Sequence, residues 1–333
     1  PVETILSGPA ASLMGLKALL PNEEDSILID IGGTTTDVFF LVDGVPLFEP
    51  SGIQIGEHKT LVRAVYSRSI GLGGDSAIRV LDGKILIGPN REGPAYALGG
   101  PMPTPSDALI ALGLLKIGDI DKARQAMALL PLGTNISIED KARKVLDTVG
   151  TIVASKVNKE LRKVNNKPVY TIKELIHGRK ITPKRINIIG GPAKSLQPIL
   201  EEKLKLPTYF PKHYPIANAI GAALAKVTTE INLLADTSRG ILSVPEFGLQ
   251  ERIPKGYTLD SARKKAISLL RKKAIQYGAE DKEIETEIIE ESCFNIVQGF
   301  STGGYNIRIK AQVKPGLIQE LQTNRIMRGN KDD

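Results

Sequence analysis

The chain has 333 residues, of which 41% are hydrophobic and 24% charged, as in an ordinary globular protein with room for two domains. No apolar run reaches the roughly 20 residues that span a bilayer. The single cysteine, Cys293, excludes an intrachain disulfide and a multi-cysteine zinc site, and is expected to be a small packed side chain. We therefore expect a reduced, cytoplasmic protein. The formal net charge is +7, but the basic stretches lack interleaved aromatic residues, which favours a solvated surface over a nucleic-acid interface.

The first fifty residues predict a helix followed by two strands that are joined through a glycine loop. The small and apolar residues of Ala10–Leu20 favour a helix that packs closely against a neighbour. The apolar strand Ile27–Ile29 ends at Asp30, and two glycines, three threonines and Asp37 precede the next apolar run, Val38–Val42. This order of strand, Gly-Gly loop and strand brings a backbone close to an oxyanion.

The residue types of this loop are those of a phosphate-binding site. Glycine has no Cβ, so its backbone adopts unusual φ/ψ and lets N–H groups point at a phosphate. Threonine hydroxyls add donors, and an acid at the end of a strand can hold Mg²⁺ through water, because hard cations prefer oxygen ligands. The alternative is a hairpin whose glycines only form the bend. The candidate phosphate-binding residues are Gly32, Gly33, Thr34 and Thr35.

A second glycine-rich region follows, in which the segment SIGLGGDS carries Asp75. The Pro/Gly-rich stretch Gly88–Pro105 predicts a long loop, and loops of this length are usually functional or mobile. Ser106 is expected to cap a helix over Ala108–Leu115, with Asp107 in its first turn. Asp75 and Asp107 are candidates for contact with a substrate, and ordinary turn and capping roles are the alternative.

The middle of the chain predicts a long amphipathic helix over Ile138–Val164. The strand Ile186–Ile189 then runs into a Gly-Gly-Pro turn, and a helix begins near Lys194 or Ser195. Ligands in open α/β sheets bind at the carboxyl ends of strands, where this turn lies, although a plain tight turn is the alternative. Ile216–Val227 predicts a second helix of small residues. The candidate residues of the turn are Gly190, Gly191 and Pro192.

Beyond about residue 240 the pattern changes and predicts a small α+β appendage. An amphipathic helix is expected over Leu259–Tyr277. A turn at Gly303-Gly304 should lead into a half-buried antiparallel strand over Tyr305–Val313, where apolar and polar residues alternate. The expected domains are residues 1–240 and 241–333.

These motifs, taken in order, resemble the second half of the actin-like ATPase superfamily. The resemblance implies an α/β, ribonuclease H-like fold with a mixed sheet and flanking helices. More closely, the chain is similar to the hydantoinase A / 5-oxoprolinase family over roughly its first 225 residues. The motifs that carry this likeness are Ser7–Ala10, Asp30–Val38, Ile70–Gly74, Gly88-Pro89, Gly93–Ala95, Gly99-Gly100, Pro103-Thr104 and Asp107-Ala108.

The family resemblance implies an ATP-dependent hydrolase that opens a cyclic amide of the hydantoin or 5-oxoproline type. Asp30 would hold Mg²⁺, and Gly190, Gly191 and Pro192 would flank the adenosine of ATP. The candidate catalytic residues are Asp37, Asp75 and Asp107. The family usually has a third glycine where Asp75 stands and a Cys-Tyr-Gly-Arg-like run where this chain has Tyr96–Gly99, so the sequence leaves the exact substrate open.

The superfamily's first phosphate loop precedes the first helix of small residues, in a separate amino-terminal lobe. We therefore expect a fragment, or one subunit of a homo- or hetero-oligomer, that needs this lobe from elsewhere. Two alternatives stay open at this point. One is a non-catalytic regulatory or scaffold domain with the same fold. The other is a sugar or acid kinase, which the absence of an acid between Gly8 and Leu20 disfavours.

Overall fold

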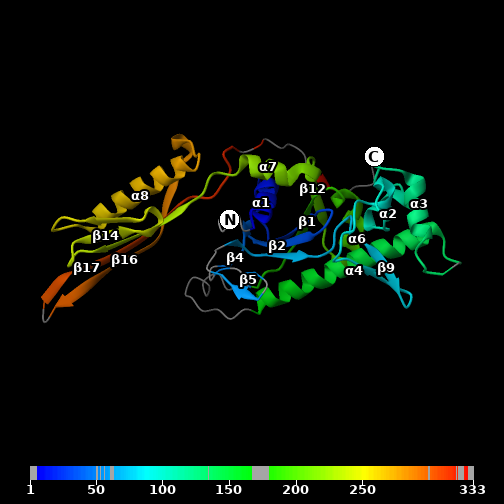
Figure 1. Ribbon diagram of the computed structural model, residues 1–333, viewed down its shortest axis with the longest axis horizontal. Helices are drawn as coiled ribbons and strands as arrows, with labels where there is room; N and C mark the ends of the chain where they lie inside the picture. The colour runs from blue at the N-terminus through cyan, green and yellow to red at the C-terminus, as the bar shows by residue number, and fades with distance from the viewer. Residues whose placement is uncertain are drawn as a thin grey trace. The chain divides into compact units, whose positions relative to one another are not determined.

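The computed structural model describes residues 6–49, 52, 54–55, 57–60, 64–133, 135–166, 180–298, 301–319, 321 and 326–328. The chain divides into two compact units, residues 1–223 with 321–333, and residues 224–320 (Figure 1). The division thus falls after Ala223, where the sequence suggested a boundary near residue 240, and the last residues belong with the first unit. None of the described helices is long and apolar enough to cross a membrane.

The first unit begins with one helix and a series of strands, and most of its helices come later in the chain. Its first half comprises α1 (Ser7–Leu19), β1 (Ser26–Ile31), β2 (Thr36–Val42), β3 (Val45–Pro46), β4 (Phe48–Glu49), β5 (Gln54–Ile55), β6 (His58–Lys59), β7 (Ala64–Val65), β8 (Ser67–Ile70), β9 (Ile78–Leu81) and β10 (Lys84–Ile87). Its second half comprises the 3-10 helix η2 (Tyr96–Leu98), α2 (Pro105–Ala111), α3 (Ile120–Ala128), α4 (Ile138–Asn165), β11 (Arg185–Ile189), α6 (Ala193–Leu204), β12 (Thr208–Pro211), η3 (Tyr214–Ile216), α7 (Ala217–Leu224) and β18 (Ile326–Arg328).

A mixed sheet forms the centre of this unit. Its strand order is β18-β12-β11-β1-β2-β3, and β8 also pairs with β2. β1 runs parallel to β11 and antiparallel to β2, and the register places Asp30 beside Ile189 and opposite Asp37. Because β1 and β11 are parallel, the loops that follow them leave the same edge of the sheet. The predicted α/β fold, with its mixed sheet, flanking helices and small α+β appendage, is confirmed.

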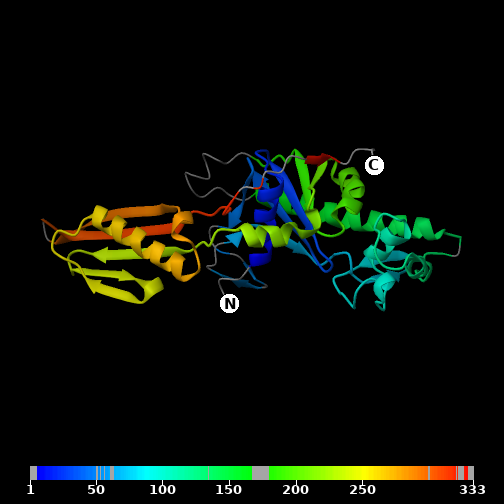
Figure 2. The ribbon, with the colours of Figure 1, turned by 90° about the horizontal axis from the view of Figure 1, so that it is seen from above.

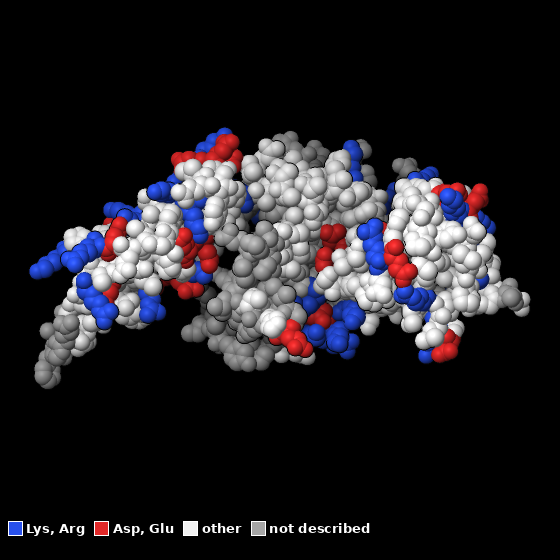
Figure 3. All heavy atoms as spheres, in the orientation of Figure 1, with Lys and Arg blue, Asp and Glu red and all other residues white. Residues whose placement is uncertain are grey.

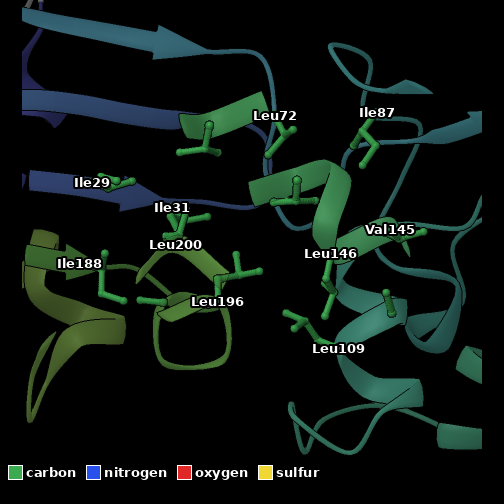
Figure 4. Packing of buried hydrophobic residues seen from close by; sticks show 14 of the residues in the cluster. Ile29, Ile31, Leu72, Ile87, Leu109, Val145, Leu146, Ile188, Leu196 and Leu200 are labelled. Atoms are coloured by element: carbon green, nitrogen blue, oxygen red, sulfur yellow. The ribbon is translucent and has the colours of Figure 1, made fainter. Parts of the chain in front are cut away.

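The two faces of the sheet have separate cores. Ile29 and Ile31 of β1 pack toward Leu196 and Leu200 of α6 (Figure 4). Leu28 instead belongs to a cluster with leucines of α1, and Figure 1 shows α1 and α7 on the opposite side of the sheet from α4. Side chains alternate along a strand, so Asp30 lies on the same face as Leu28 and points toward α1.

α1 and α7 approach each other so closely that only glycine fits at their contact. A Cβ on Gly15 would lie 2.0 Å from the carbonyl oxygen of Ala217, and a Cβ on Gly221 would lie 1.9 Å from that of Ala11. The close packing that the small residues predicted for these two helices is confirmed, although α7 ends at Leu224.

The second unit is a five-stranded antiparallel sheet with one helix. Its elements are β13 (Glu230–Asp236), β14 (Ile241–Val244), the 3-10 helix η4 (Pro245–Phe247), β15 (Leu249–Arg252), α8 (Leu259–Gln276), the 3-10 helix η5 (Asp281–Glu283), β16 (Thr286–Gln298) and β17 (Ser301–Val313). The strand order is β15-β14-β13-β17-β16, and Figure 2 shows α8 lying along the sheet. Ile307 and Ile309 of β17 pack with Leu270 of α8, as the predicted alternation requires.

Three local predictions are wrong. Gly303-Gly304 is not a turn but lies inside β17, which pairs with β16 on either side of that dipeptide. Cys293 is exposed, because β16 is an edge strand of the second sheet. Thr104, not Ser106, caps α2: its hydroxyl accepts from the backbone N–H of Asp107, and the Asp107 carboxylate accepts from the backbone N–H of Thr104.

The surface mixes charges of both signs. On the face that Figure 3 shows, Lys and Arg side chains are interspersed with Asp and Glu side chains. Ion pairs such as Arg263–Glu291, with 2.5 Å between Nε and Oε2, and Lys265–Glu251, with 2.8 Å between Nζ and Oε1, illustrate the pattern.

Candidate functional site

Two glycine loops from different parts of the chain lie directly on each other. The backbone N–H of Gly74 donates to the carbonyl oxygen of Gly32 over 2.9 Å, and that of Asp75 donates to the carbonyl oxygen of Gly33 over 2.7 Å. A Cβ on Gly73 would lie 2.5 Å from the backbone of Gly33, so the contact needs glycine on both sides. The loop at Gly32-Gly33 and the loop at Gly73–Asp75, which the sequence predicted only as separate motifs, therefore lie in contact.

A third glycine loop, between β11 and α6, closes on the same point. Gly190 has φ of 99°, and its N–H donates to the carbonyl oxygen of Tyr214. A Cβ there would lie 2.2 Å from the carbonyl oxygen of Ile31 and 3.0 Å from Oδ1 of Asp30. Pro192 follows and lies near Gly74, while nothing stands within 4 Å of where a Cβ on Gly191 would be. The three loops therefore surround the end of β1.

Asp30 and Asp37 lie side by side at this edge of the sheet. Burial raises the pKa of the Asp30 carboxyl, against a hydrogen bond from Ser12 that lowers it. Burial also raises the pKa of Asp37, against a hydrogen bond with Ser69, and the nearby charge of Asp30 raises it further. Two half-buried carboxylates with raised pKa values repel each other and together attract a cation.

The loop between them offers backbone donors. Gly32 donates its N–H to the carbonyl oxygen of Thr35, which closes the loop. None of the residues that the structure describes accepts a hydrogen bond from the backbone N–H of Gly33, Thr34 or Thr35, and Gly33 and Thr34 are exposed. Successive free N–H groups of this kind form an anion-binding site. Thr36, by contrast, has a structural role, because its hydroxyl donates to the carbonyl oxygen of Leu72.

Asp75 lies against the glycine loop that follows β1, whereas the side chain of Asp107 is buried away from solvent. Oδ2 of Asp75 would stand 2.7 Å from a Cβ on Gly33, and it pairs with Arg91 over 2.9 Å. Asp107 is fully buried, and its two oxygens accept from the backbone N–H groups of Tyr96, Ala97 and Thr104 and from the Thr104 hydroxyl. These bonds favour a role for Asp107 in shaping the loop over contact with a substrate.

Asp30 and Asp37 are the acids at the end of β1 that could take part in holding a metal ion. Within the described ranges no three His, Cys, Asp or Glu side chains are placed to hold a metal ion together. Mg²⁺ keeps several waters and takes one or two carboxylates together with substrate phosphates, and Asp30 with Asp37 provides such a pair. Two surface hollows, of about 650 Å³ on α8 and about 400 Å³ beside α4, are lined by other residues.

Two residues of the site carry no motif in the sequence. Ser12 of α1 donates its hydroxyl to Oδ2 of Asp30, and Asn218 of α7 donates its amide to the Ser12 hydroxyl. Both stand in helices whose residue pattern predicts only packing. The spacing of 206 positions between them left no local signal from which their contact could be predicted.

Solved structures with this fold are larger than the chain. A nucleotide-free acetone carboxylase, described as performing ATP-dependent acetone carboxylation, aligns with a TM-score of 0.63 and 17% identity over 96% of this chain and 50% of its own. An ATP-dependent caprolactamase from Pseudomonas jessenii aligns with a TM-score of 0.53 and 18% identity over 94% of this chain and 49% of its own. The chain thus spans about half the length of each.

The family assignment comes from the sequence itself. No curated protein sequence matches the chain. The model of the hydantoinase/oxoprolinase family matches residues 1–231, which include α1, α7 and all three glycine loops. The chain therefore belongs to the hydantoinase/oxoprolinase family.

Proposed function

We propose that this chain is the nucleotide-holding part of an ATP-dependent hydrolase that opens a cyclic amide of the hydantoin or 5-oxoproline type. The observation that carries the proposal is the meeting of three glycine loops around Asp30, with the free N–H groups of Gly33, Thr34 and Thr35 beside it. Family membership and the match to an ATP-dependent caprolactamase, whose named substrate caprolactam is a cyclic amide, support this reading.

Each part of the site has an assigned task. Gly33, Thr34 and Thr35 donate to the phosphates of ATP, whereas Gly32, which the sequence also suggested as a donor, uses its N–H to close the loop on Thr35. Asp30 holds the waters of Mg²⁺, and Gly190, Gly191 and Pro192 flank the adenosine. ATP, when bound, supplies the phosphoryl group that activates the amide carbonyl for attack by water. The protein's contribution is then mainly to position the reacting groups and to stabilise charge.

The substrate side is assigned to the loops that rest on the phosphate loop. We assign Asp37 to polarise the attacking group. Asp75, which pairs with Arg91 and lies against Gly33, is assigned to the substrate side. Asp107 supports this side from below through its bonds to Tyr96 and Thr104. We propose that the opposite wall of the cleft comes from an amino-terminal lobe or a partner subunit, since the matched enzymes are about twice as long.

A non-catalytic regulatory or scaffold domain is the second candidate. The observation that favours it is that Asp107, one of the candidate catalytic acids, is fully buried and accepts hydrogen bonds from backbone N–H groups, so it is not available to a substrate. ATP hydrolysis that a cyclic amide stimulates would separate the two. Scaffold proteins would bind nucleotide with no response to hydantoin or 5-oxoproline.

The test is calorimetric titration of ATP, with and without Mg²⁺, into the chain and into Asp30→Asn. We expect the Mg²⁺-dependent gain in affinity to fall at least tenfold, or about 1.4 kcal/mol, in Asp30→Asn. Asp119→Asn is the matched control, because Asp119 is an exposed cap of α3 and asparagine caps a helix equally well. If Asp30→Asn bound Mg-ATP as tightly as the unaltered chain, the assignment of Asp30 to Mg²⁺ would be wrong.

A further inference from the structure

A chain of hydrogen bonds runs from α7 through α1 to Asp30. Ser12 is 1% exposed, and its Oγ lies 2.5 Å from Oδ2 of Asp30. Nδ2 of Asn218 lies 2.7 Å from that Oγ and 3.0 Å from the carbonyl oxygen of Gly8. The carbonyl of Gly8 is only an acceptor, so the Asn218 atom that meets it must be the NH₂ group, which donates to both partners.

This arrangement decides where the single hydroxyl proton of Ser12 goes. Ser12 has two acceptors within reach, Oδ2 of Asp30 at 2.5 Å and the carbonyl oxygen of Gly8 at 3.2 Å. Asn218 satisfies the Gly8 carbonyl and also donates to the Ser12 oxygen, so the proton of Ser12 is left for Asp30. A hydroxyl that accepts one hydrogen bond donates a stronger one in turn.

The other oxygen of Asp30 then faces the glycine loops. Oδ1 lies on the side of Gly190, where a Cβ would come within 3.0 Å of it, and no donor among the described residues bonds to it. We infer that Ser12 is a positioning residue that clamps Oδ2 of Asp30 and leaves Oδ1 directed at the nucleotide, and that Asn218 acts only through Ser12. This inference rests on the proposed function, because it assumes that Asp30 holds Mg²⁺ beside the nucleotide.

The molecule offers a matched control for this pair. At the opposite end of β1, Nδ2 of Asn22 donates over 2.9 Å to Oγ of Ser26, and Ser26 is fully buried. The Asn22–Ser26 pair therefore repeats the chemistry of the Asn218–Ser12 pair with no carboxylate of the site attached. Ser26→Ala and Asn22→Ala therefore measure how much ATP affinity changes when a bond of this kind is lost far from the site.

The experiment is a double-mutant cycle read out by ATP affinity with Mg²⁺ and with EDTA. Ser12→Ala should lower the Mg²⁺-dependent gain in affinity about tenfold, because a hydrogen bond to a charged group is lost. Asn218→Ala, at an exposed position, should lower it about threefold alone and not at all in the Ser12→Ala background, since coupled residues are not additive. Ser26→Ala and Asn22→Ala should leave the gain unchanged.

The outcomes separate the inference from the proposed function. An equal Mg²⁺-dependent gain in Ser12→Ala and the unaltered chain overturns the inference alone. Additive effects of Ser12→Ala and Asn218→Ala overturn the route through Ser12. If Mg²⁺ does not raise the ATP affinity of the unaltered chain, both the inference and the assignment of Asp30 to Mg²⁺ are overturned. Thermal unfolding of each variant shows that the chain is folded when affinity is measured.

Discussion

Asp30 and Asp37 stand directly opposite each other in the antiparallel ladder of β1 and β2, and the charge of Asp30 contributes to the raised pKa of Asp37. Both carboxylates lie on the face of the sheet that α1 covers. Like charges at facing positions destabilise a sheet, so this pair is a local cost to folding that a bound cation would offset.

Asp30→Asn should lower the pKa of the Asp37 carboxyl. The substitution removes a neighbouring negative charge while keeping the size of the side chain, and burial of Asp37 is unchanged. NMR titration of the Asp37 carboxyl carbon measures the shift directly. Asp119→Asn, at the start of α3, should leave the titration of Asp37 where it is; an equal shift in both variants would contradict the pairwise origin.

Asp37→Asn should change how stability depends on pH. The folded-state pKa of Asp37 is raised above its ordinary value of 3.8, so the folded chain binds more protons than the unfolded chain as pH rises from 3.8 through the folded pKa. The free energy of unfolding therefore falls with rising pH over this window. Asparagine cannot ionise, so the variant should gain stability relative to the unaltered chain across it, as urea unfolding at a series of pH values would show.

Gly221→Ala should separate α1 from α7. The new Cβ would stand 1.9 Å from the carbonyl oxygen of Ala11, and since both are backbone-fixed the helices must move, at a cost of about 1–3 kcal/mol. Gly8→Ala is the control, because nothing lies within 4 Å of its Cβ and alanine in a helix is worth roughly 0.5–1 kcal/mol over glycine. Opposite signs of the two changes in unfolding free energy are expected; a neutral Gly221→Ala would contradict the close contact.

Asp107→Asn should destabilise the loop that precedes α2. The new NH₂ group would face backbone donors of Tyr96, Ala97 or Thr104, at a cost of about 2 kcal/mol or more in unfolding free energy. Asp119→Asn should cost only a few tenths of a kcal/mol, since Asp119 is exposed. Faster amide hydrogen exchange at Ala97 would locate the damage, and unchanged exchange there would speak against it.

The two units should unfold separately, because each has its own core. Leu270→Ala removes a fully buried side chain of α8, and Leu196→Ala removes a buried side chain of α6. Each should cost about 2–5 kcal/mol in its own unit. Calorimetry is expected to show two transitions, each moved by one substitution; a single transition moved by both would contradict the division at Ala223.

Much of the fold could be predicted because local rules govern it. The Asp-Gly pairs at Asp43 and Asp82 take positive φ and form tight hairpins, as this dipeptide favours. The helical stripe of Ile138–Val164 becomes α4. The glycine loops at Gly32 and Gly190 were also expected at strand ends. Glycines at these positions predict such loops, because positive φ and close backbone contact both require glycine.

Other features escaped prediction because they depend on what lies next to them in space. Cys293 was expected to be packed, but its strand is the edge of a sheet whose order no local pattern encodes. Gly303-Gly304 looks like a turn in isolation, and pairing with β16 keeps it extended. Ser106 and Thr104 are both good caps, and only the surroundings of Asp107 select Thr104.

The sequence by itself determined the elements, the glycine loops and the acids at the strand ends, because φ/ψ preferences and hydrophobic periodicity act between near neighbours. Only the tertiary structure decided that three loops meet at one edge and that Asn218 reaches Asp30 through Ser12. Those contacts join residues up to 206 positions apart, and they arise because β1 and β11 pair in parallel and glycines let α1 and α7 touch.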